Sequence, residues 1–303
     1  MAAKGIIEKE LSYIMGIPES PEDIGTYDDL IKRLEENKEF RVKVLKNDTE
    51  KFLRVDYKDE QYIVQILIEE FEVPELFTVA HQINENDYNK IMESKLGVTT
   101  IMEFGESNID SYHLQLKLIS TMIPNLLGIM DFSSQKLLSG RWAKMAAESY
   151  IQPAPEYIYT IQAINDEDGS VWLHTHGLRR CGSLELEIIG SDTENYQNHG
   201  TAIQMIAKNI VTNRYLEEEK EPFYIGEGIV GTWLPLEEVL DGYPPESLGG
   251  SAGRDDEHGE TAVVYVYLTE EDYKNGRYAH ISSVNEIMKN NPLYFISDEE
   301  TMR

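Results

Sequence analysis

The sequence predicts an α+β protein in which mainly antiparallel sheets are covered by helices, arranged as two packed units. Runs of alternating apolar and polar residues predict half-buried strands. Turn residues such as Asn47-Asp48, Lys58-Asp59 and Asp168-Gly169 lie between these runs, and such short connections join antiparallel strands. Other stretches repeat apolar residues every three or four positions, which predicts amphipathic helices.

The first half of the chain predicts one helix followed by a three-stranded meander. The helix covers residues 26–37 and begins with Thr26 and Asp29 in the spacing of a capping box. Alternating residues then predict three antiparallel strands within residues 40–68. The residues expected to face inward are Val42, Val44, Val55, Val64 and Ile66.

The remaining pattern divides near residue 150. The N-terminal unit, 1–150, adds predicted helices over 86–95, 109–123 and 140–148 and strands over 97–103 and 126–130. The second α+β unit, 151–303, has predicted strands over 157–164, 171–176, 184–189 and 262–268 and helices over 201–215 and 281–289. Its segment 241–260 is rich in Gly, Pro, Asp and Glu, which predicts a mobile acidic loop.

The charge balance is strongly acidic. The chain has 27 Lys and Arg residues against 55 Asp and Glu residues, a formal net charge of −28. Such a body repels phosphate backbones, so we expect no nucleic-acid partner. It attracts cations, so a basic protein or a metal ion is the partner that the charge favours, although solubility alone also accounts for an acidic composition.

Cellular location follows from the cysteine content and the apolar segments. Cys181 is the only cysteine, so no intramolecular disulfide forms, and this suits a reducing compartment. The N-terminal residues lack the apolar core of a signal peptide, and no uninterrupted apolar run reaches the ~18 residues of a membrane span. We therefore expect a cytoplasmic protein without a membrane partner.

Polar chemistry concentrates in the segment 171–189. If 171–176 is a strand, its two-residue period places Trp172, His174 and His176 on one face. The next strand carries the carboxylates of Glu185 and Glu187.

Two interpretations of these side chains remain open. His174, His176, Glu185 and Glu187 together supply the imidazole and carboxylate ligands that suit a divalent metal such as zinc, iron or manganese. Alternatively, the histidines pack beside the tryptophan and form hydrogen bonds with the backbone, and the glutamates belong to an ordinary half-buried strand. We expect that no metal is bound, and the sequence indicates no other cofactor.

The turn after the histidines carries a cationic pair, Arg179 and Arg180. Guanidinium groups bind carboxylate or phosphate through a bidentate fork, so the pair is a candidate binding site, although a solvated turn is the simpler interpretation. The candidate binding residues are Trp172, His174, His176, Arg179, Arg180, Glu185 and Glu187.

Known catalytic patterns do not add an activity. The sequence has no Walker-type phosphate loop, no Gly-x-Ser-x-Gly and no His-Glu-x-x-His. The glycines at 226, 228 and 231 have dinucleotide-binding spacing, but no strand-to-helix pattern surrounds them. A cupin would place a glutamate within about five residues of its His-x-His pair, whereas Glu185 follows His176 by nine.

Three blocks of residues nevertheless resemble a family. They are the run Ser139 to Ser149, the run Tyr157-Ile-Tyr-Thr-Ile-Gln-Ala, and Trp172-Leu-His-Thr-His-Gly-Leu. Together they resemble an uncharacterised bacterial family, the domain of unknown function numbered four-zero-two-six, over about residues 25–215. The resemblance implies a bacterial cytoplasmic protein and brings no activity with it.

The sequence therefore supports two hypotheses about function. The first is an acidic binding or interaction module whose partner surface includes residues 172–187, with an unknown small-molecule ligand. The alternative is a metal-dependent enzyme that uses His174, His176 and one glutamate.

Overall fold

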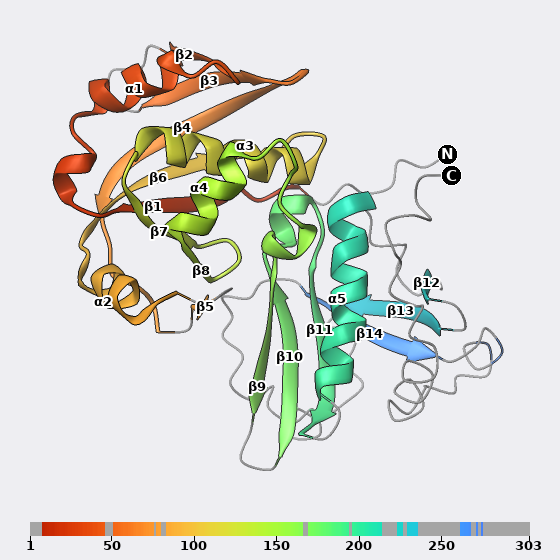
Figure 1. Ribbon diagram of the computed structural model, residues 1–303. Helices are drawn as coiled ribbons and strands as arrows, with labels where there is room; N and C mark the ends of the chain where they lie inside the picture. The colour runs from red at the N-terminus through yellow and green to blue at the C-terminus, as the bar shows by residue number, and fades with distance from the viewer. Residues whose placement is uncertain are drawn as a thin grey trace. The chain divides into compact units, whose positions relative to one another are not determined.

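The computed structural model confirms the α+β class, with two sheets that lie in two compact units (Figure 1). The structure describes residues 8–45, 51–75, 77–79, 83–165, 169–193, 196–213, 223–226, 229–235, 261–267, 271 and 274. The first unit comprises Met1–Thr160, His176–Ser183 and Val211–Arg214, and the second comprises Ile161–Thr175, Leu184–Ile210 and Tyr215–Arg303. The chain therefore returns to the first unit twice after first leaving it.

The first unit is built on an eight-stranded, mostly antiparallel sheet in the order β2-β3-β4-β6-β1-β7-β8-β5. The strands are β1 (Ser12–Pro18), β2 (Arg41–Leu45), β3 (Phe52–Tyr57), β4 (Glu60–Glu70), β5 (Thr78–Val79), β6 (Leu96–Met102), β7 (Leu126–Asp131) and β8 (Lys136–Ser139). β1 lies in the middle of the sheet, although its residues show no alternating pattern. It pairs with β6 on one side and with β7 on the other.

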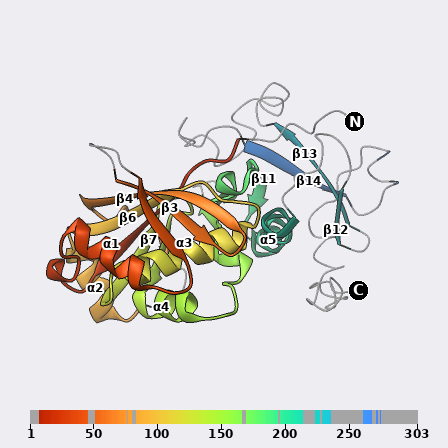
Figure 2. The ribbon, with the colours of Figure 1, turned by 90° about the horizontal axis from the view of Figure 1, so that it is seen from above.

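Helices cover both faces of this sheet in part. They are α1 (Tyr27–Glu36), α2 (Glu85–Glu93), α3 (Asn108–Met122) and α4 (Gly140–Glu148). α3 contacts β6 and β1 and packs against α1 and α4, so that α1, α3 and α4 share one face (Figure 2). The opposite face receives Ile91 of α2, which packs in one core with Met15, Ile17 and Leu127.

The close packing of α3 depends on its neighbours. A Cβ at Gly16 of β1 would lie only 2.5 Å from the side chain of Ile119, so the glycine lets the helix approach the sheet. Polar residues of α3 are buried with their partners. Gln115 donates hydrogen bonds to the backbone oxygens of Ser12 and Thr100 at 3.2 and 3.0 Å, which ties the helix to β1 and β6.

The predicted meander is present as β2, β3 and β4. Val55, Val64 and Ile66 are buried on the face covered by α1 and α3, as expected. Val42 is only half-buried and Val44 is 40% exposed, so both were wrongly placed in the core. β2 is the outermost strand of the sheet, so the helices that cover the inner strands shield its side chains less completely.

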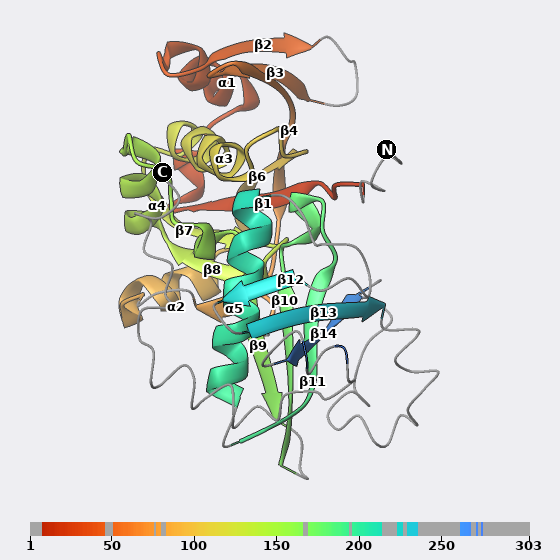
Figure 3. The same ribbon diagram turned by 90° about the vertical axis from the view of Figure 1, so that its right-hand side faces the viewer.

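The second unit contains a six-stranded sheet in the order β12-β13-β14-β11-β10-β9. Its strands are β9 (Thr160–Asn165), β10 (Ser170–His176), β11 (Glu185–Asp192), β12 (Phe223–Gly226), β13 (Ile229–Pro235) and β14 (Thr261–Tyr267). Helix α5 (Tyr196–Asn213) runs beside β10 and β11 (Figure 3), and it starts earlier than the predicted 201. The predicted acidic loop 241–260 and helix 281–289 lie outside the described residues.

Within the part of the chain that the structure describes, no helix has the length and apolar content needed to cross a membrane.

Replacing Ile66 by Ala should lower the free energy of unfolding by about 2–5 kcal/mol, because the fully buried side chain leaves a cavity in the core. Ile63 on the same strand is 50% exposed, so Ile63→Ala is the matched control and should cost much less. Urea denaturation of the two variants measures this difference. Equal losses would show that the two faces of β4 are buried alike.

Candidate functional site

The structure brings some of the predicted site residues together on β10 and β11. These strands pair in antiparallel fashion, with His174 opposite Glu187. The indole nitrogen of Trp172 donates a hydrogen bond to Glu187 Oε2 at 3.0 Å, and its ring stacks on His174 with centroids 3.9 Å apart. All three side chains are buried, so this is an internal polar cluster of the second unit.

Glu185 is held by a different neighbour. The hydroxyl of Thr175 donates to Glu185 Oε2 at 2.7 Å and accepts from the backbone N–H of Leu186 at 2.8 Å. This exchange satisfies buried polar groups at the end of the strand pair. It fixes the register of β10 on β11 and leaves the carboxylate buried rather than presented to solvent.

The four proposed metal ligands lie on the paired strands β10 and β11. His174 and His176 are two residues apart on β10, and Glu185 and Glu187 are two residues apart on β11. Across the described ranges, no group of three or more His, Cys, Asp or Glu side chains is placed to hold a metal ion.

Arg180, predicted as a binding residue, lies in the interior of the first unit. Its guanidinium donates to Asp131 through two bonds, Nη1 to Oδ1 at 3.0 Å and Nη2 to Oδ2 at 2.9 Å. Both side chains are completely buried. Nη1 also donates a hydrogen bond to Ser12 Oγ at 3.1 Å. The bidentate fork expected for a ligand is thus used within the protein. The neighbouring Arg179 pairs with Glu10.

Two buried side chains, those of Lys136 and Arg180, donate hydrogen bonds to four consecutive backbone carbonyls. Lys136 Nζ donates to the oxygens of Glu156, Tyr157 and Tyr159 at 3.0, 3.2 and 2.6 Å. Arg180 Nη2 donates to the oxygen between them, that of Ile158. Burial lowers the pKa of Lys136 to about 7, although the carboxylate of Asp131 acts in the opposite direction. The segment that precedes β9 is therefore fixed by hydrogen bonds from these two side chains, and those of Lys136 are charge-assisted while its amine is protonated.

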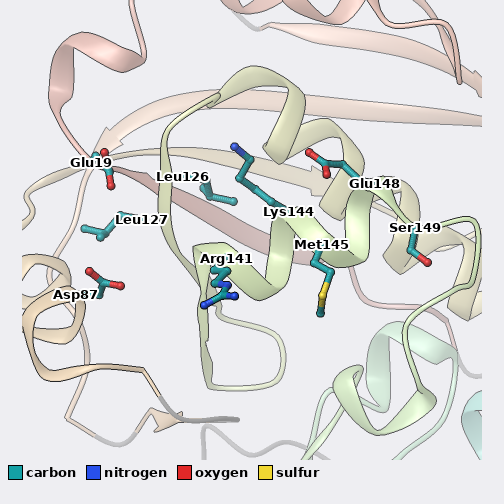
Figure 4. A pocket seen from close by; sticks show the side chains of 9 residues that line it. All are labelled: Glu19, Asp87, Leu126, Leu127, Arg141, Lys144, Met145, Glu148 and Ser149. Atoms are coloured by element: carbon teal, nitrogen blue, oxygen red, sulfur yellow. The ribbon is translucent and has the colours of Figure 1, made fainter.

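An accessible site lies elsewhere in the first unit, beside α4. A groove of about 730 Å³ opens at the start of β7 (Figure 4). Its lining residues are Glu19, Asp87, Leu126, Leu127, Arg141, Lys144, Met145, Glu148 and Ser149. We call it the α4 groove. Leu126 and Leu127 lie at its base but are only 6% and 5% exposed, whereas Met145 is 64% exposed and provides accessible apolar surface.

The wall of the α4 groove is one stripe of a helix. Ser139 caps α4 by accepting a hydrogen bond from the N–H of Trp142, and Ala143, Ala146 and Ala147 turn inward. The helical period then leaves Arg141, Lys144, Met145 and Glu148 on the outward side. They are labelled along the helix in Figure 4.

Charges of both signs surround this apolar base. Glu19, Asp87 and Glu148 contribute carboxylates, and Lys144 Nζ donates to the backbone oxygen of Pro124 at 2.7 Å. Arg141 is exposed and forms no ion pair with any residue in the described ranges. The groove is thus a solvent-exposed surface that carries charges of both signs.

Exposed apolar side chains continue from the α4 groove along the chain. Met145 is 64% exposed, and beyond the helix Tyr150 is fully exposed and Ile151 is 79% exposed. Single exposed apolar residues are ordinary, whereas here several lie in one stretch of the chain. Sequence reasoning did not single them out. The available signal was the helical spacing of Arg141, Lys144, Met145 and Glu148, which any exposed helix face shares.

Comparison with known families gives one match for each half of the chain. The profile described as protein of unknown function (DUF4026), N-terminal, matches residues 12–153, and its C-terminal counterpart matches residues 158–266. This confirms the resemblance seen in the sequence and extends it at both ends. No curated protein and no solved structure is significantly similar to this chain.

We expect that the purified protein carries no stoichiometric metal and that a chelator leaves its melting temperature unchanged, because the described His and Glu side chains do not form a ligand set. The double variant His174→Ala, His176→Ala should lower the melting temperature, because it removes the imidazole ring of His174 that stacks on Trp172. Elemental analysis and thermal melts test both points. A metal present at about one per chain and lost in the variant would contradict this expectation and favour the enzyme hypothesis instead.

The buried ammonium of Lys136 should make stability depend on pH. The folded protein releases this proton near pH 7, whereas the unfolded chain keeps it until the ordinary lysine value of 10.5. Between these values the unfolded state binds more protons, so this group makes the free energy of unfolding rise with pH, by up to about 1.4 kcal/mol per pH unit.

The difference in unfolding free energy between wild type and Lys136→Met should therefore increase from pH 7 to pH 9, measured by urea denaturation. The exposed Lys32 gives a matched control, because Lys32→Met should show no such trend. A wild-type advantage over Lys136→Met that stays constant with pH would contradict the depressed pKa.

Proposed function

Because the chain belongs to the DUF4026 family, whose description assigns no activity, we propose from its own geometry that it is a protein-binding module that uses the α4 groove. The observation that carries the proposal is the exposed side chain of Met145, which lies with Leu126 and Leu127 in an open, charged groove. The predicted polar residues of β10 and β11 are buried instead, which removes them from direct contact with a partner.

The composition of the α4 groove defines the partner segment that it fits. An apolar side chain of the partner covers Met145, which is 64% exposed, beside Leu126 and Leu127, and burial of that surface supplies affinity. Three carboxylates border the groove against two cations, and Lys144 is already engaged by a backbone oxygen. Basic side chains on either side of the apolar residue therefore complement Glu19, Asp87 and Glu148.

The charge of the whole chain acts in the same direction. At a net charge of −28, the body attracts a basic protein before contact and accelerates the encounter at low salt. The same field repels nucleic acid, which is not a partner in this proposal. We also place the protein in the bacterial cytoplasm. This rests on the resemblance of its sequence to a bacterial family and on Cys181, a buried free thiol.

A peptide of about ten residues that alternates lysine and leucine should bind the protein at about 150 mM NaCl, where charges more than about 8 Å apart are screened. The double variant Glu19→Lys, Glu148→Lys should weaken binding about tenfold, because it reverses two charges of the groove. Fluorescence anisotropy with a labelled peptide measures the dissociation constants.

The control variant is Glu35→Lys, Glu36→Lys on the exposed end of α1, which changes the net charge by the same amount. It should leave the dissociation constant within about twofold of the wild type. Equal weakening by the two double variants would mean that the peptide responds only to net charge, and the α4 groove would then not be the binding site.

A further inference from the structure

A second charged surface lies on the uncovered face of the meander, away from α1. On β3, Leu53, Val55 and Tyr57 are buried on the helix side, so Phe52, Arg54 and Asp56 lie on the other face. The pairing of β2 with β3 sets Lys43 opposite Arg54 and Arg41 opposite Asp56 on that face. Three cations thus gather on two neighbouring strands of a chain in which acidic residues outnumber basic ones two to one.

The pairing of Lys43 with Arg54 is unfavourable in the isolated protein. Like charges directly opposite each other on antiparallel strands repel. The carboxylate that partly compensates this repulsion is that of Asp56, which lies 3.5 Å from Arg54 Nε. It also accepts a hydrogen bond from Gln61 at 3.0 Å. In the described part of the chain, Lys43 forms no ion pair. An anion bound on this face would turn the repulsion into attraction.

Apolar side chains accompany the cations. Ile63 of β4 is opposite Arg54 and is 50% exposed. Leu45 and Phe52 form the adjacent cross-strand pair on the same face and are only half-buried. A ligand for this surface therefore needs carboxylates next to apolar side chains, rather than negative charge alone.

The position of β2 adds an extended geometry. β2 is the outermost strand of the sheet, and Figures 1 and 3 show it outside β3. An edge strand has backbone groups on its outer side that can pair with an additional strand. A strand alternating acidic and apolar residues would place its carboxylates beside Lys43 and Arg41 on the open face. Its apolar residues would lie on the other face beside Val44, which is opposite Leu53 and 40% exposed.

We propose that the open face and outer edge of β2 and β3 bind an extended acidic segment of a partner protein, separately from the α4 groove. A nucleic acid is a poorer fit, because three cations neutralise few phosphates and the net charge of −28 repels the remainder. A short peptide brings its carboxylates to the cations without presenting a long polyanion to the acidic body.

The test uses a labelled peptide of about eight residues, the length of an ordinary strand, that alternates glutamate and valine. It should bind the full chain, and Lys43→Glu should weaken binding about tenfold because it removes one cation and adds an anion. The same substitution should raise the melting temperature, because the new carboxylate would lie opposite Arg54 and replace repulsion by attraction. Lys32→Glu, the same charge change on exposed α1, should leave peptide affinity within about twofold.

Opposite effects of Lys43→Glu on affinity and on stability support a ligand surface, because a purely structural role moves stability alone. Several results would overturn the proposal. One is the absence of glutamate–valine binding at ~1 mM peptide, a concentration that detects even very weak complexes. A lysine–valine peptide or an oligothymidine that binds as tightly as the glutamate–valine peptide would also overturn it. So would Lys32→Glu, if it weakened peptide binding as much as Lys43→Glu does. Aggregation of Lys43→Glu without any peptide binding would assign the cations to protection of the sheet edge.

Discussion

The buried ion pair between Arg180 and Asp131 is the contact on which the first unit depends most. Removing two charges from water is costly, and their attraction compensates only when the geometry is good and the remaining donors are satisfied. Here the pair is bidentate, both side chains are fully buried, and Ser12 and the oxygen of Ile158 accept further bonds, which leaves only Nε of the guanidinium without a partner among the described residues. One side chain therefore joins β1, β7 and the approach to β9 to the returning segment 176–183.

This contact also explains why a glycine follows the histidine pair. Gly177 has a φ of 107°, which side-chain-bearing residues rarely adopt. A Cβ there would lie 2.5 Å from the oxygen of Ile158, the carbonyl that Arg180 binds. Gly177 thus permits the chain to pass close to the segment that Lys136 and Arg180 hold. The glycine of the His-Thr-His-Gly block, which belongs to one of the three blocks that carry the family resemblance, has a structural explanation in this turn.

The sequence predicted the elements whose two faces differ, and of the strands buried on both faces it predicted β6 and β7 but missed β1. The meander alternates because α1 and α3 cover one side of it only. β1 was missed because its residues do not alternate and because Ser12, Gly16 and Pro18 interrupt its apolar run. Arg180 was taken for a surface cation for a related reason. Its partner, Asp131, lies 49 residues away, and no local spacing indicates that the two meet. The α4 groove likewise needs Leu126, Leu127 and Asp87 from other elements beside an ordinary exposed helix face.

Net charge and local charge describe different steps of recognition in this protein. The value of −28 acts at a distance and favours basic partners, but at physiological salt its reach is only about 8 Å. At contact, the charges within a few ångströms decide what fits. The α4 groove offers carboxylates around leucine, whereas β2 and β3 offer cations around isoleucine and phenylalanine. Composition could predict the first preference and not the second, because the cations of the meander become neighbours only when its strands pair in register.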